Sequence, residues 1–112
     1  MIGYSMEGGA YAEFIAIEAG RVALKPKSAN HIEAASLALV AQPAMLMLDR
    51  AGVRKGRTVL IQGAGRALGS VAVQVAHQRK ATVIGASSAR SLEPVKAYRA
   101  DRVLDSVLTT RW

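Results

Sequence analysis

Apolar residues follow two different periods between residues 58 and 86. A short run, Val59-Leu60-Ile61, leads into a Gly-rich segment, and a second run, Thr82-Val83-Ile84, follows about twenty residues later. Between these runs the apolar residues recur three and four apart, at Leu68, Val71, Ala72, Val75 and Ala76. Strands favour short β-branched runs, and helices favour the wider spacing. The pattern predicts a strand, a turn, a helix over about 71–79 and a second strand.

The same alternation continues toward the C-terminus. A helix is expected from Ser91 to about Arg99, with Pro94 tolerated in its first turn, and Val103-Leu104 predicts a third short strand. The order β-α-β-α-β implies parallel pairing with right-handed crossovers. The fold class expected is therefore α/β, the first half of a Rossmann-type parallel sheet, preceded by a small β segment and an apolar helix.

The N-terminal part has weaker patterning. We expect a loop over residues 1–9, then two strand-like runs within residues 12–24, the first around Phe14 and the second around Val22, with a turn at Ala19-Gly20.

A helix should begin at Asn30, because Asn30 can cap it and Glu33 completes a capping box. Its apolar run meets Pro43, which indicates either a kink or a new helix with Pro43 at its first position. That second piece should end at Gly52.

Composition narrows the classes of function. The 112 residues are 51% apolar and contain no cysteine, which excludes disulfides, thiolate zinc sites and cysteine nucleophiles. No apolar stretch reaches the ~18 residues of a membrane span, and no secretory signal is evident, so we expect a cytoplasmic protein without membrane contact. His31 and His77 stand apart without acidic neighbours, so no metal site is expected.

The charge is uneven. Net charge is +7, and residues 50–99 hold ten Lys or Arg against one acid, Glu93. Such a field attracts polyanions, although the basic residues look scattered and aromatic residues that stack on bases are almost absent. Nucleic acid is therefore an unlikely partner on this pattern, and a solvated surface is the plain alternative.

The Gly-rich turn carries the candidate chemistry. Its spacing is Gly63-x-Gly65-x-x-x-Gly69, which departs from the strict dinucleotide fingerprint because Leu68 occupies the last position. Free amides at the start of the following helix would face an anion, and a ligand-free strand-to-helix turn is the alternative. The candidate pyrophosphate site comprises Gly63, Ala64, Gly65, Arg66, Ala67, Leu68, Gly69 and Ser70.

The segment after the second strand points to the cofactor type. An acid there would hold a ribose 2′-hydroxyl, but the segment 85–90 has none and offers Ser87, Ser88 and Arg90 instead. Hydroxyls and a guanidinium suit a 2′-phosphate, which favours NADP(H) over NAD. Ser88 or Ser91 capping a helix, with Arg90 merely solvated, is the alternative.

An ordered series of motifs resembles a known family. These are Tyr11-Ala12-Glu13-Phe14, Ala34-Ala35-Ser36-Leu37, Asp49-Arg50-Ala51-Gly52-Val53, Gly56-Arg57-Thr58-Val59-Leu60-Ile61, Gly69-Ser70-Val71-Ala72-Val73-Gln74 and Ala100-Asp101-Arg102-Val103-Leu104-Asp105. The run resembles the medium-chain dehydrogenase/reductase superfamily, in its zinc-independent quinone oxidoreductase-like branch. That resemblance implies an NADPH-dependent oxidoreductase acting on a small quinone or enone, often a dimer, of which this chain covers a part.

The resemblance also implies an organisation. Residues 1–27 would be a remnant of a GroES-like catalytic domain, 28–56 connecting helices, and 57–112 a partial NAD(P)-binding Rossmann domain. The partner would be a second copy or a protein that supplies the missing domains. No catalytic residue is assigned.

Four positions depart from the family pattern. Pro43 stands where a threonine is common, and Arg66, Lys80 and Arg99 stand where glycines are common; a positive φ at Arg99 would be strained. These departures keep open a non-catalytic, truncated or degenerate homologue acting as a structural or interaction module. A basic nucleic-acid binder is the third hypothesis.

Overall fold

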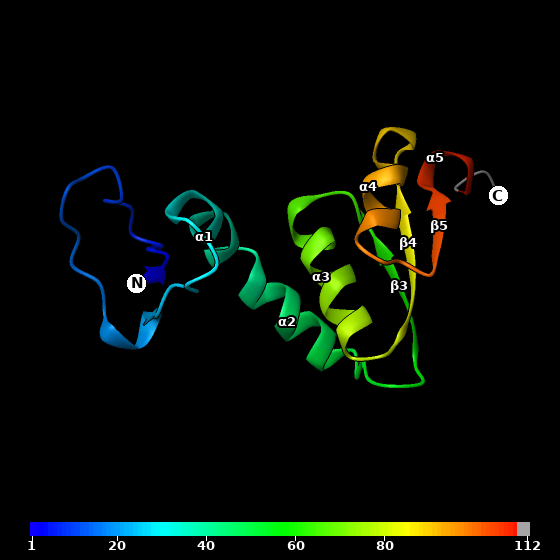
Figure 1. The fold of residues 1–112 in the computed structure, drawn as a ribbon, viewed down its shortest axis with the longest axis horizontal. Helices are drawn as coiled ribbons and strands as arrows, with labels where there is room; N and C mark the ends of the chain where they lie inside the picture. Colours follow the sequence, from blue (N-terminus) through cyan, green and yellow to red (C-terminus); the bar gives the residue numbers. More distant parts are fainter. Residues whose placement is uncertain (110–112) are drawn as a thin grey trace. The chain divides into compact units, whose positions relative to one another are not determined.

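The structure is a computed structural model that describes residues 1–109, so the last three residues of the predicted segment 57–112 lie outside the described part. The chain forms two compact units that divide between Leu39 and Val40, and each is described by itself (Figure 1). The predicted boundaries near residues 27 and 56 remain predictions.

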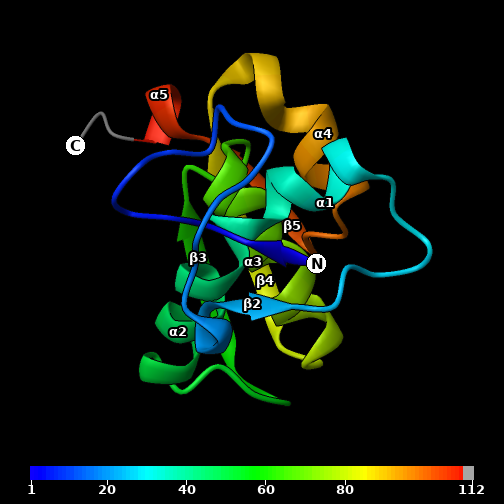
Figure 2. The same cartoon turned by 90° about the vertical axis from the view of Figure 1, so that its left-hand side faces the viewer.

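The first unit is built around a short antiparallel pair. β1 (Ile2–Gly3) pairs with β2 (Val22–Ala23), and the 3-10 helix η1 (Ala19–Arg21) precedes β2 (Figure 2). The expected loop over residues 1–9 is thus wrong at Ile2–Gly3. The expected strand around Phe14 is also wrong, since residues 12–18 contain no strand and Phe14 is 89% exposed. Alternating apolar residues favour a strand, but a strand also needs a partner.

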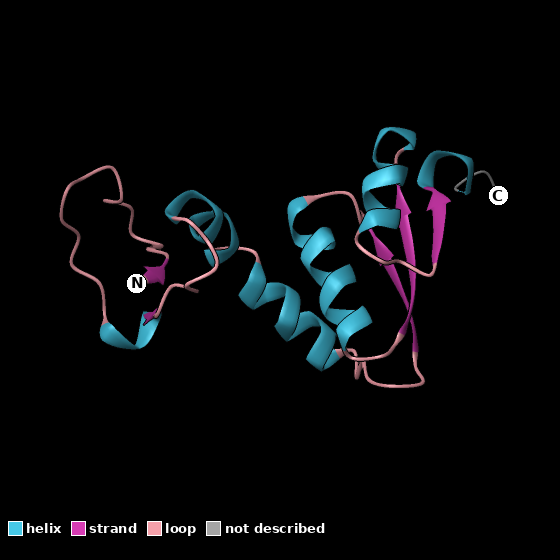
Figure 3. Ribbon diagram, viewed as in Figure 1, coloured by secondary structure: helices cyan, strands magenta, loops and turns pink. Residues whose placement is uncertain are grey.

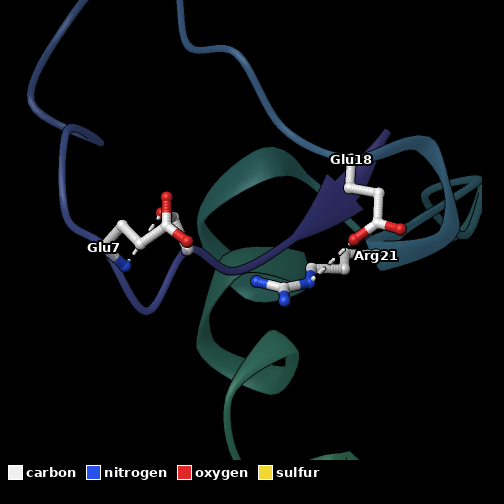
Figure 4. A network of polar contacts seen from close by, with 4 residues as sticks. Glu7, Glu18 and Arg21 are labelled. Atoms are coloured by element: carbon white, nitrogen blue, oxygen red, sulfur yellow. Dashed lines mark hydrogen bonds and ion pairs between the residues drawn. The ribbon is translucent and has the colours of Figure 1, made fainter.

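Polar contacts hold the loops of this unit. Arg21 forms an exposed ion pair with Glu18 at 3.4 Å, and the N–H of Glu7 donates to the hydroxyl of Ser5 at 3.3 Å (Figure 4). Exposed pairs of this kind contribute about 0–1 kcal/mol. The unit therefore depends on few strong interactions.

Helix α1 (His31–Ala38) begins as the sequence predicts. The Asn30 side chain accepts the Glu33 N–H at 2.9 Å, and the Glu33 carboxylate accepts the Asn30 N–H at 2.9 Å. This reciprocal capping box satisfies two amides that a helix start leaves unpaired.

Pro43 lies in the first turn of a new helix and does not kink the preceding one. Helix α2 (Ala41–Arg50) begins after two turn residues, so Pro43 is its third residue and not its first, as one alternative supposed. The third position still lacks an intrahelical partner for its N–H, which explains why proline fits there. No single helix within residues 1–109 is long and apolar enough to cross a membrane. The consecutive helices α1 and α2 reach the required length and apolar composition only when they are counted together as one bent pair.

The second unit contains a parallel three-stranded sheet, as predicted. β3 (Thr58–Gln62), β4 (Thr82–Ser87) and β5 (Arg102–Asp105) lie in the order β3-β4-β5, with Thr58 opposite Thr82 and Ile84 opposite Arg102. The helices of this unit after α2 are α3 (Ala67–Gln78), η2 (Ala89–Ser91), α4 (Leu92–Ala97) and α5 (Ser106–Thr109). Helix α3 starts four residues before the expected range of about 71–79, and close to Leu68, where the apolar period begins.

One face of the sheet forms the core. α3 and α4 lie on that face (Figure 3), where Val73, Val83 and Val95 are fully buried, and α2 packs mainly against α3. Val73 was not among the residues that the three-and-four spacing predicted for the apolar face of this helix. The other face is partly open, since Leu60 in the edge strand β3 is 63% exposed. An ion pair of 2.7 Å between Arg79 and Asp49 joins the C-terminal ends of α3 and α2.

Three helices of this unit end in the same hydrogen-bonded motif. After α2, the N–H of Gly52 donates to Asp49 and that of Val53 to Leu48; the same pairing recurs after α3 and α4. This motif requires a left-handed residue, which is Gly52 (φ 64°), Lys80 (φ 59°) and Arg99 (φ 71°) in turn. The positive φ expected at Arg99 is confirmed, and Lys80 shares it.

We therefore expect Lys80→Gly and Arg99→Gly each to stabilise the second unit by about 1 kcal/mol, because a Cβ in this conformation is strained and glycine relieves the strain. Urea unfolding followed by circular dichroism measures the change. Lys80→Ala is the matched control, since it removes the charge and keeps the Cβ. An equal gain from Lys80→Ala and Lys80→Gly would assign the effect to charge instead of backbone strain.

Candidate functional site

The Gly-rich turn occupies residues 63–66 between β3 and α3. Gly63 adopts φ 71°, which lets the chain reverse directly after the strand. The N–H of Ala64 donates to the carbonyl of Ala86 in β4 at 3.0 Å, and the N–H of Arg66 donates to the carbonyl of Gly63 at 2.9 Å. The first bond fixes the turn against the carboxyl end of the sheet, and the second closes the turn itself.

The start of α3 presents amides that have no acceptor among the hydrogen bonds of residues 1–109. The N–H of Ser70 makes the first helical bond, to the Arg66 carbonyl at 2.8 Å, and the amides of Ala67, Leu68 and Gly69 precede it. Helix N-termini of this kind carry partial positive charge and bind anions. The turn therefore places unpaired amides directly after the end of β3.

Arg66 stands at the N-cap position of α3. Its backbone is extended (φ −94°, ψ 165°), its side chain makes no capping bond, and the residue is exposed. A Cβ added to Gly63 would lie 3.9 Å from Cδ of Arg66, so the stem of Arg66 runs beside the turn.

Two of the predicted contributors are already engaged. Ala64 is fully buried, and its N–H is used by Ala86. The Ser70 hydroxyl donates to the carbonyl of Ala67 at 2.9 Å. These two groups shape the turn, and among the first residues of α3 Ala67 is exposed whereas Gly69 is buried.

Close approach explains two of the glycines. A Cβ on Gly69 would collide with the carbonyl oxygen of Gly63 and approach Cα of Ala64 at 2.8 Å. A Cβ on Gly65 would collide with Cβ of Ser91 and lie 2.6 Å from Oγ of Ser87. The first contact seats the helix on the turn, and the second brings the turn against the residues that follow β4.

Among the serines of residues 87–91, Ser87 and Ser91 lie beside the turn at Gly65. Ser87 is 5% exposed at the end of β4, Ser88 precedes η2, and Arg90 is exposed within η2. Ser88 and Ser91 occupy N-cap positions, yet neither side chain makes a capping hydrogen bond. The capping alternative therefore does not account for their hydroxyls.

Ser91 is the residue that sequence reasoning missed as a member of the site. Its side chain meets Gly65 across a separation of 26 positions, since a Cβ on Gly65 would lie 2.9 Å from Ser91 Oγ. The sequence indicated only that a helix begins near Ser91, and the start of a helix gives no information on tertiary contacts. No acidic residue occurs in segments 63–70 or 87–91, so Arg66 and Arg90 set the charge of the site.

Two relatives of the chain are named as a reductase and an oxidoreductase. It is 38% identical over 99 residues to the 2-methylene-furan-3-one reductase of Solanum lycopersicum, and 33% identical over 99 residues to the chloroplastic NADPH-dependent alkenal/one oxidoreductase of Arabidopsis thaliana. Each alignment covers 87% of this chain and 26% of the relative. The chain thus spans about a quarter of the length of these relatives. No family model matches it.

Solved structures agree with this relationship. An NAD-dependent alcohol dehydrogenase matches with a TM-score of 0.82 at 34% identity, over 88% of this chain and 29% of the other. The quinone oxidoreductase from Thermus thermophilus, whose structures include a complex with NADPH, matches with a TM-score of 0.70 at 35% identity, over 75% and 29%. The α/β fold of the second unit is shared with both groups.

The contact between Gly65 and Ser91 gives a test of the site's geometry. Gly65→Ala should destabilise the second unit by about 1–3 kcal/mol, because the methyl group overpacks the junction. Ser91→Gly in the same molecule removes two of the three close contacts and should recover part of that loss. A double-mutant cycle measured by urea unfolding gives the coupling. Strictly additive losses would show that the two residues do not touch.

Proposed function

The chain belongs to the medium-chain dehydrogenase/reductase superfamily, and on that basis we propose that it is the dinucleotide-binding segment of an NADPH-dependent oxidoreductase. Its substrates would be small quinones or enones, the class named for its relatives. The observation that carries the proposal is the set of free amides at Ala67, Leu68 and Gly69, placed directly after a tight Gly turn at the carboxyl end of a parallel sheet.

The residues of the site fit such a cofactor. The amides of Ala67–Gly69 would take oxygens of the pyrophosphate, and the charge of Arg66 would assist them. Ser87, Ser88 and Arg90 would hold the 2′-phosphate, and the absence of an acid in this segment removes the usual partner of an NAD ribose. NADPH, when bound, supplies the hydride, and the protein orients it.

The remaining parts of the enzyme's function are also proposals. A second copy of the chain, or a partner that supplies further domains, would enclose the substrate and exclude water from it. The described residues identify no catalytic acid or base. The proposed location is cytoplasmic, although one of the relatives reported above is chloroplastic.

A non-catalytic role is the second candidate. It is favoured by the partly open sheet face at Leu60, by the unpaired edge of β3, and by the strained residues Lys80 and Arg99. Exposed apolar surface and free strand edges promote association with other chains. This role predicts no effect of either nicotinamide cofactor on stability.

Cofactor binding separates the two roles. We expect NADPH to raise the unfolding temperature, with a stabilisation of about 2.7 kcal/mol at a concentration 100 times its Kd. NADH should have a smaller effect. Arg90→Gln should reduce the preference for NADPH about tenfold, whereas Arg102→Gln, which removes an arginine from β5, should leave it unchanged. No shift at millimolar concentrations of either cofactor would support the non-catalytic role.

Arg66 provides a further test of the turn. Because Arg66 is exposed beside free amides, Arg66→Ala should weaken NADPH binding severalfold at low ionic strength and less at 0.5 M salt, where charge interactions are screened. Fluorescence titration of NADPH measures the affinity. Tighter binding by the alanine variant would show instead that the Arg66 side chain obstructs the cofactor.

A further inference from the structure

The amino-terminal end of the sheet collects most of the basic residues of the second unit. All three strands are parallel, so the chain enters them at one end, opposite the Gly turn (Figure 1). The segments that lead into β3, β4 and β5, with the first residue of β5, carry Arg54, Lys55, Arg57, Arg79, Lys80, Arg99 and Arg102. Residues that look scattered in the sequence therefore share one end of the fold.

The acids at this end are already engaged. Asp49 pairs with Arg79 at 2.7 Å, and the Asp101 carboxylate accepts the N–H of Val83 at 2.7 Å. Arg54 donates to the carbonyl of Gly52 at 3.2 Å, and the ion pairs of residues 1–109 do not include Arg50, Arg54 or Arg57. The positive charge at these three arginines is thus not neutralised by the protein.

A pocket of about 450 Å³ lies among those arginines. Arg50 from the end of α2, Arg54 from the connection and Arg57 before β3 line it, together with the apolar Val53, Val59 and Leu60. No acidic residue lines it, and its volume is within the range of small-molecule sites. The pocket lies where β3 begins, whereas the Gly turn follows the other end of the same strand.

We propose that this pocket is a second anion site, which binds a phosphate monoester carried on a small apolar group. Guanidinium groups form paired hydrogen bonds with phosphate oxygens, and three of them suit a tetrahedral dianion better than a planar carboxylate with two oxygens. The apolar wall accommodates the body of the ligand. The surrounding basic residues raise the local concentration of anions.

The concave shape favours a small ligand over a nucleic acid. Between residues 50 and 107 the only aromatic residue is Tyr98, and it packs against the core, so no surface for base stacking accompanies the arginines. The proposal does not depend on the function of the Gly turn, because the two sites use different residues.

The test is a titration of the ¹⁵N-labelled 112-residue chain with phenyl phosphate, followed by NMR. We expect saturable amide shifts at residues 52–58, weaker binding of inorganic phosphate, which lacks the apolar body, and weaker binding of benzoate. Shifts at residues 63–70 report on the Gly turn separately, so failure of one site is distinguishable from failure of the other.

Two variants of the same connection sharpen the result. Arg57→Gln should weaken phenyl phosphate binding about tenfold, because it removes a charged hydrogen-bond donor from the pocket. Lys55→Gln removes the same charge from a residue that does not line the pocket, and should change the affinity less than about twofold. Circular dichroism confirms that both variants are folded.

Several outcomes would overturn the proposal. These are the absence of shifts at residues 52–58 up to 10 mM phenyl phosphate, equal losses in Arg57→Gln and Lys55→Gln, or benzoate binding as tightly as phenyl phosphate. Equal losses of affinity in the two variants would show that phenyl phosphate responds to the overall positive charge and not to a defined site. If a short DNA duplex bound more tightly than phenyl phosphate and shifted the amide signals of the same residues, the ligand of this pocket would be a nucleic acid.

Discussion

The second unit depends on the close approach of α3 to the turn before it. Gly69 lies so near the Gly63 carbonyl and Ala64 that no side chain fits between them. This contact lets the helix start directly above the end of β3 and points its first amides away from the sheet. Ala64, which touches Gly69, packs inside the core, and a Cβ on Gly85 would lie 3.2 Å from Cβ of Ala64. A bulkier residue at 69 would move the helix and disturb each of these contacts.

Local chemistry explains which features the sequence could predict. The capping box at Asn30 depends on residues close in sequence, and the parallel sheet follows from the order of strands and helices; the structure confirms both. The glycine that the family commonly has at the position of Arg99 pointed to a left-handed residue there, and Arg99 has a positive φ. The strand expected around Phe14 failed because pairing is decided by distant residues. Ser91 was missed for the same reason, since only the fold brings it to Gly65.

The two ends of the sheet differ in how they attract negative charge. At the carboxyl end the attraction comes mainly from backbone amides at a helix start, with Arg66 and Arg90 nearby. At the amino end it comes from side chains alone, which must outweigh the partial negative charge of the helix C-termini that lie there. Amides hold a ligand in one fixed geometry, whereas arginine side chains can adjust to several. The first arrangement suits a single cofactor, and the second tolerates variation in the ligand.

The bond between Asp101 and Val83 has a consequence for local opening. The N–H of Val83 is held by the Asp101 side chain at 2.7 Å, and the N–H of Asp101 returns to the Val83 carbonyl at 2.9 Å. This amide of the central strand is thus protected by a carboxylate from the connection into β5 and not by a neighbouring strand. Exchange of this amide with deuterium would report the detachment of β5 while β3 and β4 stay paired. The rate of this one exchange thus measures how cooperatively the three strands unfold.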